Sequence, residues 1–319
     1  MEGRSKAAEM LMMVAELSWI TLCALGLSIW CVLESLFLPH SLKVKRVYAG
    51  KLVLVTGAGS GLGRLLAQRL GKMGARLVLW DVDAAGMAET KRLLESAGVE
   101  AHAYTVDLSQ REAIYQTAEK VKSEVGTVEV LVNNAGVVRG GSLDVVPDKS
   151  IERVFAVNTL AHFWTTKAFL PGMKERNEGQ IVGVASGAGL FGAVDLVDYC
   201  SSKFAAVGML ESLALELETK GFTGISTVLV CPYYINTGMF DGVKTRFDAV
   251  LPILEPDYAV EKIVQAMETE QELLLIPRLL YFLFFLKGFL PSRVGHYLVH
   301  ALGVSHSMDQ FKGSAKKLA

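Results

Sequence analysis

The stretch LVLVTGAGSGLGRLLAQRL, residues 52–70, joins a short apolar run to a helical pattern through a glycine-rich turn. Glycines at such a turn let the backbone bend tightly and approach a pyrophosphate, whose charge then lies at the positive end of the helix. Gly57, Gly61 and Gly63 have the spacing G-x-x-x-G-x-G, which departs by one residue from the usual dinucleotide fingerprint. Because a strand pattern precedes the turn and a helical pattern follows it, a dinucleotide site is favoured over an ordinary loop.

Apolar runs like this one recur between residues 51 and 276 and alternate with longer helical patterns. The runs LVLV, LVLW and VEVLV look like strands that are buried on both faces, as in a parallel sheet covered by helices. We therefore predict an α/β fold with a doubly wound, Rossmann-type parallel sheet of about seven strands. The expected strands are Leu52–Thr56, Arg76–Trp80, Glu100–Val106, Val128–Asn133, Gln180–Ala185, Gly224–Cys231 and Glu272–Ile276.

The composition excludes several classes of protein. The 319 residues include 32 basic and 33 acidic side chains, so no global field draws nucleic acid to the chain. The four cysteines form no C-x-x-C pair, which argues against a disulfide framework or a metal site and for a reducing compartment. Hydrophobic residues reach 51%, and the surplus lies at the two ends, so we expect contact with a membrane.

The N-terminal surplus is an uncharged run of 17 residues, Leu17–Leu33, which is near the lower length limit for a membrane span. A membrane helix, a cleaved signal peptide and a buried core helix are all open, and the membrane helix is favoured because no small-residue cleavage site is evident. Basic residues place the main domain in the cytoplasm. They are Lys43, Lys45 and Arg46 after the run, against Arg4 and Lys6 before it.

The C-terminal surplus is PRLLYFLFFLKGFLP, whose only charges are Arg278 and Lys287. It is either a helix packed against the domain or a partner subunit, or an element lying in a membrane interface. The polar residues 307–319 are expected to be loosely held, and the closing KKLA is either a dilysine retrieval signal or a solvated tail. The expected divisions are an anchor and basic linker at 1–48, a catalytic domain at 49–276 and an extension at 277–319.

An acidic residue at the end of the second expected strand indicates which dinucleotide binds. Asp81 follows Gly63 by 18 residues, where a carboxylate accepts both adenosine ribose hydroxyls and repels a 2′-phosphate. Ser60 in the turn adds no positive charge, so NAD is favoured over NADP, although a solvated strand-end carboxylate is the plainer interpretation of Asp81. Asp107 either binds the adenine or caps a helix.

Tyr199 and Lys203 are four residues apart in the helical pattern DYCSSKFAAVGMLESLALEL, so both lie on one helix face. A phenol beside an ammonium has a lowered pKa, and such a phenol can accept the hydroxyl proton when an alcohol gives a hydride to a nicotinamide. Because a Y-x-x-x-K pair is common by chance, it needs a wider context to carry this interpretation.

That context is a set of motifs that together resemble the short-chain dehydrogenase/reductase family over Lys51–Ile276. They are TGAGSGLG at 56–63, NNAG at 133–136, Asn158, Ser186 and YCSSK at 199–203. The resemblance implies that Tyr199 is the general acid/base and that Lys203 lowers its pKa and binds the nicotinamide ribose. It also implies that Ser186 orients the substrate oxygen and that Asn158 holds a water in a proton relay.

The same resemblance, together with the glycine turn, gives an expected set of cofactor residues. They are Gly57, Ser60, Gly61, Leu62, Gly63, Asp81, Asp107, Asn134, Tyr199, Lys203, Pro232 and Thr237. The chain departs from the family after the sixth strand, where Cys231-Pro232-Tyr233-Tyr234 replaces the frequent P-G. The apolar side chains that follow, among them Phe240, either cover an apolar substrate or pack in the core.

Stretches such as LVLWD, DYCSSKFA and CPYYINTGMF are similar to membrane-bound retinol dehydrogenases of the epidermal type and of type 10. This resemblance implies oxidation of all-trans-retinol to retinal with NAD at the endoplasmic reticulum or lipid droplets, and a homo-oligomer. Other hypotheses are a dehydrogenase of hydroxysteroids or other lipid alcohols, an NADPH-dependent retinal reductase, and a membrane scaffold without turnover.

Overall fold

The computed structural model describes residues 2–37 and 43–312, and the chain divides into two compact units, Met1–Lys45 and Arg46–Ala319. The second unit begins three residues before the expected boundary at 49 and includes the C-terminal extension as well as the sheet. It begins early because Tyr48 is fully buried in the core. The closing KKLA lies outside the described residues.

The first unit contains the helix α1, Glu2–Phe37. Its segment Ala8–Trp30 is long and apolar enough to cross a membrane. The hydroxyls of Ser18, Thr21 and Ser28 each donate to the backbone carbonyl four residues earlier, at 2.8 Å. These polar groups therefore have partners within the helix, as an apolar environment requires. The expected apolar N-terminal helix is present, and its insertion into a membrane stays a prediction.

The second unit is built on one seven-stranded parallel sheet in the order β3-β2-β1-β4-β5-β6-β7. All seven expected strands are present, and the doubly wound fold is confirmed. Their bounds are β1 Leu52–Thr56, β2 Arg76–Asp81, β3 Ala101–Thr105, β4 Val130–Asn133, β5 Gly179–Val184, β6 Ile225–Pro232 and β7 Leu273–Ile276. Because the chain order reverses between β1 and β4, a crevice for a ligand is expected at their carboxyl ends.

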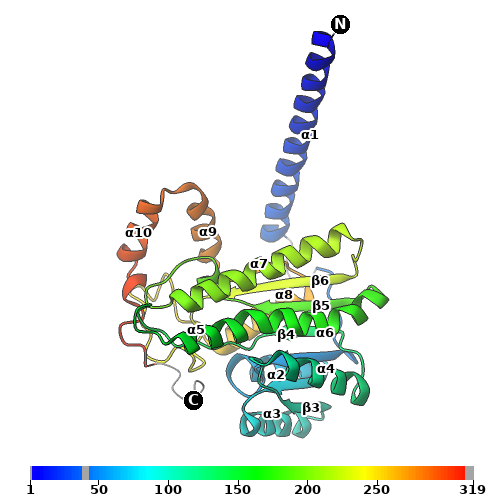
Figure 1. Cartoon of the computed structure of the whole chain (residues 1–319), viewed down its shortest axis with the longest axis vertical. Helices are drawn as coiled ribbons and strands as arrows, with labels where there is room; N and C mark the ends of the chain where they lie inside the picture. Colours follow the sequence, from blue (N-terminus) through cyan, green and yellow to red (C-terminus); the bar gives the residue numbers. More distant parts are fainter. Residues whose placement is uncertain (1, 38–42, 313–319) are drawn as a thin grey trace. The chain divides into compact units, whose positions relative to one another are not determined.

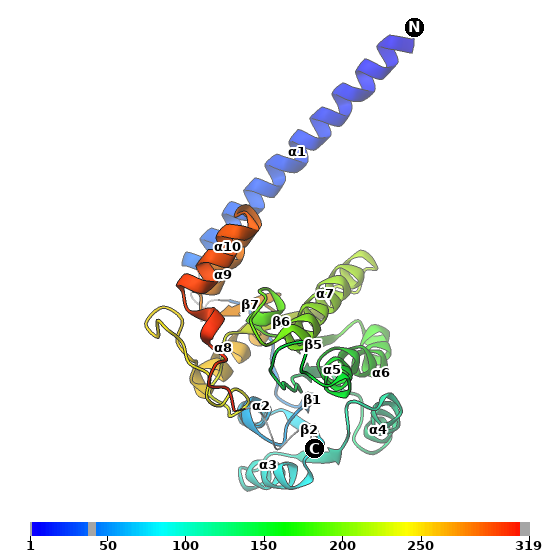
Figure 2. The same ribbon diagram turned by 60° about the vertical axis from the view of Figure 1, so that its left-hand side comes forward.

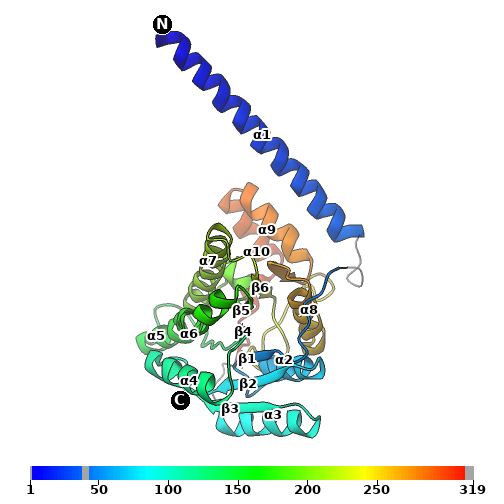
Figure 3. The ribbon, with the colours of Figure 1, turned by 90° about the vertical axis from the view of Figure 1, so that its right-hand side faces the viewer.

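Helices cover both faces of the sheet, as the nearly edge-on view in Figure 3 shows. Successive strand residues point to opposite faces, so Val53 and Val55 enter one apolar cluster and Leu54 the other. The first cluster includes side chains of α2, α3 and α8, and the second those of α4, α6 and α7. Their bounds are α2 Gly61–Lys72, α3 Ala84–Ser96, α8 Pro256–Glu268, α4 Arg111–Glu124, α6 Ala161–Arg176 and α7 Val197–Thr219, with α5 Asp148–Phe155 before α6.

The C-terminal extension forms the helices α9, Leu279–Phe289, and α10, Ser292–Ala301, which lie close together beside the sheet (Figures 1 and 2). The expectation that residues from 307 onward are loose is wrong for 307–312. Ser307 and Met308 are buried, and the Lys312 N–H donates to the Asp241 carbonyl at 3.0 Å. Met308 and Phe311 pack into a third apolar cluster, which is why a mostly polar stretch is ordered.

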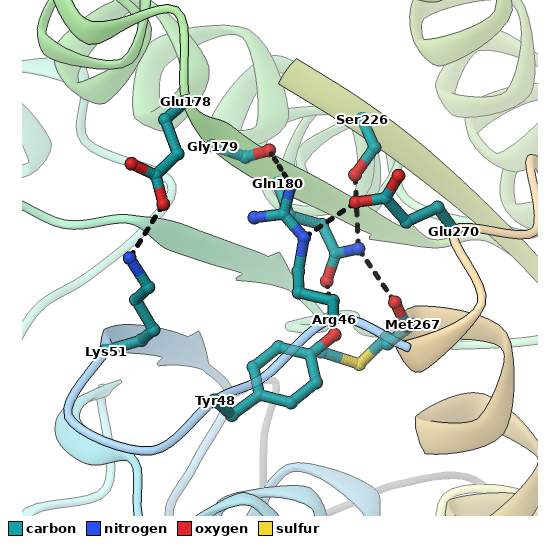
Figure 4. Close-up of polar contacts among 9 residues, drawn as sticks. All are labelled: Arg46, Tyr48, Lys51, Glu178, Gly179, Gln180, Ser226, Met267 and Glu270. Carbon is teal, nitrogen blue, oxygen red and sulfur yellow. Dashed lines mark hydrogen bonds and ion pairs between the residues drawn. The ribbon is translucent and has the colours of Figure 1, made fainter. Parts of the chain in front are cut away.

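The start of the second unit is fastened to the amino-terminal end of the sheet (Figure 4). The Tyr48 hydroxyl donates to the buried amide of Gln180 at 2.7 Å, and that amide donates to the Met267 carbonyl at 2.9 Å. Arg46 makes an ion pair with Glu270 and donates to the Gly179 carbonyl. The attachment therefore lies at the opposite end of the strands from the glycine turn.

Candidate active site

The glycine turn follows β1 and has the tight backbone that its sequence predicts. Gly57 and Gly61 have positive φ angles of +68° and +53°, which favour glycine. A Cβ on Gly63 would lie 2.1 Å from the Gly57 carbonyl oxygen, so no larger residue fits there. The Asn134 side chain donates to the Thr56 carbonyl at 2.9 Å and holds the NNAG segment beside this turn. The site is thus shaped for close approach of a phosphate to the backbone.

Asp81 lies at the end of β2 with both carboxylate oxygens engaged by the backbone. Oδ2 accepts from the Gly59 N–H and Oδ1 from the Asp83 N–H, each at 2.9 Å. Each oxygen can accept a further donor, as binding a ribose diol requires. The residue is buried rather than a solvated strand end. The Asp81 carboxylate therefore keeps acceptor positions for a hydroxyl donor at the carboxyl end of β2.

Arg64 is a basic neighbour of this region that the sequence reasoning did not consider. Its guanidinium donates to the Gly59 carbonyl, to the Gly86 carbonyl at 3.1 Å and to the Thr90 hydroxyl at 2.9 Å. These contacts join the glycine turn to α3. The sequence signal for this role was the position of Arg64 directly after Gly63 in the glycine motif. Because the guanidinium bonds three neutral oxygens of these two segments, it stabilises the turn.

Asp107 is placed differently from the other expected cofactor residues. Its Oδ1 accepts from the Ser109 N–H at 2.9 Å and from the Ser109 hydroxyl at 2.8 Å, which closes a turn before α4. The structure therefore shows the turn-forming role of this carboxylate. Adenine binding stays a prediction.

Tyr199 lies in the first turns of α7, and Ser186 follows β5. The phenol is buried, and its ring packs edge-on against Phe240 with 5.6 Å between centroids. Burial raises the pKa of Tyr199, and a hydrogen bond with Ser186 acts in the opposite direction. The net upward shift differs from the lowering expected from Lys203, because desolvation outweighs the favourable polar contact.

Lys203 is also buried, one helical turn from Tyr199. Its ammonium donates to the Val184 carbonyl at 2.9 Å and lies 5.8 Å from the centre of the Tyr199 ring. Burial lowers the pKa of Lys203 to about 8. The side chain is therefore mostly charged at neutral pH, and a buried charge of this kind is typical of functional sites.

Asn158 occupies a π-helical turn, Ala156–Leu160, between α5 and α6. Its side-chain amide donates to the Val137 carbonyl and to the Ser202 hydroxyl, and its oxygen accepts from the Val137 N–H at 2.8 Å. Both N–H groups are thus used, and only the oxygen can accept another donor. A Cβ on Gly136 would lie 3.4 Å from that oxygen and 3.5 Å from the Lys203 ammonium, which places both groups around Gly136.

Two cavities meet at Ser186 and Tyr199. One, of about 290 Å³, also contains most of the expected cofactor residues. These are Gly57, Ser60, Gly61, Leu62, Gly63, Asn134, Lys203, Pro232 and Thr237. The other, of about 590 Å³, is mostly apolar and is lined by α9 and α10. Asp81, Asp107 and Asn158 line neither cavity.

The sequence reasoning did not find that the C-terminal extension forms a wall of the second cavity. Leu280, Leu283 and Leu286 of α9 contribute to this wall, together with side chains of α10. The Lys287 ammonium donates to the Leu190 carbonyl, four residues after Ser186 along the chain, and lies 5.6 Å from the Phe191 ring centre. The apolar composition of residues 277–291 left a packed helix and a membrane-interface element open, and only the tertiary packing shows which side chains face the site.

The fold, the glycine turn and the buried Tyr199–Lys203 pair define the class of protein. The family model for short chain dehydrogenases matches residues 51–246, and the chain belongs to the short-chain dehydrogenase/reductase family. It is an oxidoreductase that uses a nicotinamide dinucleotide and acts on alcohols.

Individual relatives are similar over most of the chain. Epidermal retinol dehydrogenase 2 of Homo sapiens is 48% identical over 295 residues, 92% of this chain and 96% of that protein. Estradiol 17-beta-dehydrogenase 11 of Homo sapiens is 46% identical and is covered to 90%, with 85% of this chain. A short chain dehydrogenase/reductase of Burkholderia phymatum in complex with NAD has a TM-score of 0.68 at 27% identity, over 75% of this chain and 93% of that one.

Among the described residues, no group of three or more histidine, cysteine, aspartate or glutamate side chains is placed to hold a metal ion.

Proposed function

We propose that this protein oxidises a lipophilic alcohol with NAD, and that all-trans-retinol, converted to retinal, is the favoured substrate. The observation that carries the proposal is the position of Ser186 and Tyr199 in both cavities. An alcohol held in the apolar cavity has its oxygen at these two hydroxyls, beside the glycine-turn cavity. The names of the relatives, a retinol dehydrogenase and an estradiol dehydrogenase, support a lipid alcohol.

Several side chains hold the dinucleotide in this proposal. The glycine turn, with Ser60 and Leu62, binds the pyrophosphate, and Asp81 accepts the ribose hydroxyls. Lys203 binds the nicotinamide ribose, and Pro232 and Thr237 shape the carboxamide side. When bound, NAD accepts the hydride that leaves the alcohol carbon. Asp81 favours NAD because its carboxylate repels a 2′-phosphate.

Tyr199 and Ser186 act on the substrate oxygen. Ser186 hydrogen-bonds that oxygen and orients it, and Tyr199 receives the hydroxyl proton as the hydride leaves, so that the alcohol becomes a carbonyl. The positive charge of Lys203 favours the phenolate that starts the step. Asn158 contributes through its one remaining acceptor position and by fixing the backbone of Val137 beside the site.

The remaining part of the proposal concerns location. The apolar helix α1 anchors the chain in the endoplasmic reticulum membrane, and lipid droplets are a further site, with the second unit facing the cytoplasm. The pieces that support this are the length of α1 and its internally bonded hydroxyls. We also propose a homo-oligomer, on the family resemblance alone.

A substrate and cofactor panel tests the activity. Full-length protein in membranes is incubated with all-trans-retinol or with estradiol, each with NAD or NADP, and the products are separated by chromatography. We expect retinal with NAD to be the main product. Turnover of estradiol but not retinol would assign the protein to hydroxysteroids, in agreement with its similarity to estradiol 17-beta-dehydrogenase 11. Absence of turnover by folded protein with every pair would refute an enzymatic role and favour a scaffold.

A further inference from the structure

The extension α9–α10 has an apolar face directed away from the cavity as well as one directed toward it. On α9, Phe282, Phe285 and Phe289 are 57%, 62% and 72% exposed. Their spacing of three and four residues places them on one side of the helix. The leucines at 283, 286 and 290 line the cavity from the adjacent side of the helix. A helix that is apolar on two faces is expected to have partners on both.

The neighbouring helix α10 also has exposed apolar side chains. Tyr297 is 69% exposed and Val294 is 40% exposed. Ser292 and His296 line the cavity and are also exposed to solvent, so the cavity reaches the surface at α10. The mouth of the substrate cavity therefore lies at α10, where the exposed Tyr297 follows His296 in the chain.

The charges around this face fit an anionic lipid surface. The 36 residues from Leu273 to Met308 contain no aspartate or glutamate and include Arg278, Lys287 and Arg293. Arg278 and Arg293 are exposed at the start of α9 and of α10. Basic side chains beside exposed aromatic rings are typical of elements that lie in a membrane interface.

A second copy of the chain fits this face less well. A two-fold contact would bring the face onto itself, and no carboxylate in the segment is present to balance Arg278 or Arg293. A bilayer supplies both the apolar layer for the phenylalanines and the phosphates for the arginines.

We propose that α9 and α10 dock into the interfacial layer of a phospholipid bilayer, so that the lipophilic alcohol enters the catalytic cavity directly from the lipid. The route of entry rests on the proposed function, whereas docking itself does not. Phe282, Phe285 and Phe289, which we call the α9 aromatic face, insert among the acyl chains. The cavity-lining leucines at 283, 286 and 290 guide the alcohol toward Tyr199.

A lipid-quenching measurement tests docking without reference to catalysis. Full-length protein is reconstituted in nanodiscs of phosphatidylcholine and phosphatidylserine, with Cys23 and Cys31 replaced by serine. An environment-sensitive fluorophore is attached to Phe285→Cys or, as a control, to Leu215→Cys, an exposed apolar position on α7. We expect a lipid-borne spin label to quench the fluorophore at 285 and not at 215. Equal quenching at the two positions, or a fluorophore at 285 shielded from both lipid and water by a second copy, overturns the proposal.

A kinetic measurement tests entry from the lipid. The triple variant Phe282→Gln/Phe285→Gln/Phe289→Gln is compared with Leu143→Gln/Val145→Gln/Leu215→Gln, which removes three exposed apolar side chains elsewhere. For retinol dissolved in the nanodisc, we expect KM to rise about tenfold in the first variant only. Turnover of a short, water-soluble allylic alcohol is expected to be unchanged in both.

The outcomes separate the two proposals. An unchanged KM for bilayer retinol refutes entry through the α9 aromatic face. A loss of turnover for both alcohols shows that the fold of that variant is damaged. In that case the quenching at position 285 decides whether α9 docks in the bilayer. If the unmodified protein oxidises neither alcohol, the proposed function fails while the quenching result still stands.

Discussion

The two halves of the site are built in different ways. The cofactor half consists of the turns after β1, β2 and β4, where short segments of sequence are fixed by hydrogen bonds such as those of Asp81 and Asn134. The substrate half consists of the loop after β6 and the extension 277–312, which meet through apolar side chains. In the proposed function, local polar geometry thus sets the cofactor, and long-range apolar packing sets the substrate. Substitutions in the cofactor half are therefore expected to alter dinucleotide binding, and substitutions in the substrate half to alter binding of the alcohol.

The largest effect is expected where the halves meet. Tyr199→Phe removes the only atom through which the phenol accepts a proton and keeps the ring contact with Phe240. We expect kcat to fall by about 10⁴-fold, at the upper end for a general acid/base, with thermal stability nearly unchanged. Steady-state kinetics and thermal unfolding measure the two quantities. Retention of more than a tenth of the activity would mean that Tyr199 is not the proton acceptor.

The next effect concerns the stability cost of the buried charge. The pKa of Lys203 is about 8 in the folded protein, below its ordinary value of 10.5, so the unfolded chain binds the proton more tightly. The burial of the Lys203 ammonium lowers the free energy of unfolding by its full amount below pH 8, and this loss disappears above about pH 10.5. Lys203→Met is therefore expected to gain about 2–3 kcal/mol in unfolding free energy at pH 7 while losing activity.

The measurement is denaturant unfolding of both proteins in detergent at several pH values. The gain of Lys203→Met should shrink as the pH rises from 8 toward 10.5, and Lys203→Arg, which keeps the charge, should show no gain. If the increase in unfolding free energy of Lys203→Met did not depend on pH, the buried ammonium would not be the source of the lost stability.

A change confined to the cofactor half is expected to alter the choice of dinucleotide. Asp81→Asn keeps the shape of the side chain but removes the charge that binds ribose hydroxyls and repels a 2′-phosphate. We expect kcat/KM with NAD to fall about 10–100-fold relative to NADP, which corresponds to roughly 1.4–2.7 kcal/mol. The matched control is Asp83→Asn, two residues later, where the carboxylate caps α3. A shift of equal size in that control would exclude Asp81 as the discriminating group.

The smallest effect is expected for a change confined to the substrate half. Leu286 lines the apolar cavity from α9, and Leu286→Ala removes part of that wall. We expect KM for the lipophilic alcohol to rise about tenfold, or about 1.4 kcal/mol, while KM for NAD stays the same. Initial-rate measurements with each substrate varied in turn decide this. A parallel rise in both KM values would show that the halves are not independent.

The same difference explains which features the sequence predicts. All seven strands follow from local apolar runs, and Gly57, Ser186 and Tyr199 come together because the carboxyl ends of parallel strands share one edge. The turn closed by Asp107 and the amide contacts of Asn158 depend on exact backbone positions, so the sequence left their roles open.

The substrate half was harder to predict because its contacts join distant segments. Nothing local indicates that Phe311, in a mostly polar tail, packs near Phe240, with ring centroids 6.1 Å apart. The apolar composition of α9 does not choose between packing against the domain or a partner subunit and lying in a membrane interface. In the structure one face lines the cavity and the other is exposed.

The attachment of Arg46 and Tyr48 has a mechanical consequence. In the proposed anchoring, thermal motion of α1 in the membrane pulls and twists the second unit, and that force enters the unit at its first residues. Here it meets an ion pair to Glu270 and a buried hydrogen bond to Gln180, at the amino-terminal ends of the strands. The load is therefore carried by the stiff sheet and its flank, and the carboxyl ends, where Tyr199 and Lys203 must keep their alignment, are shielded from it.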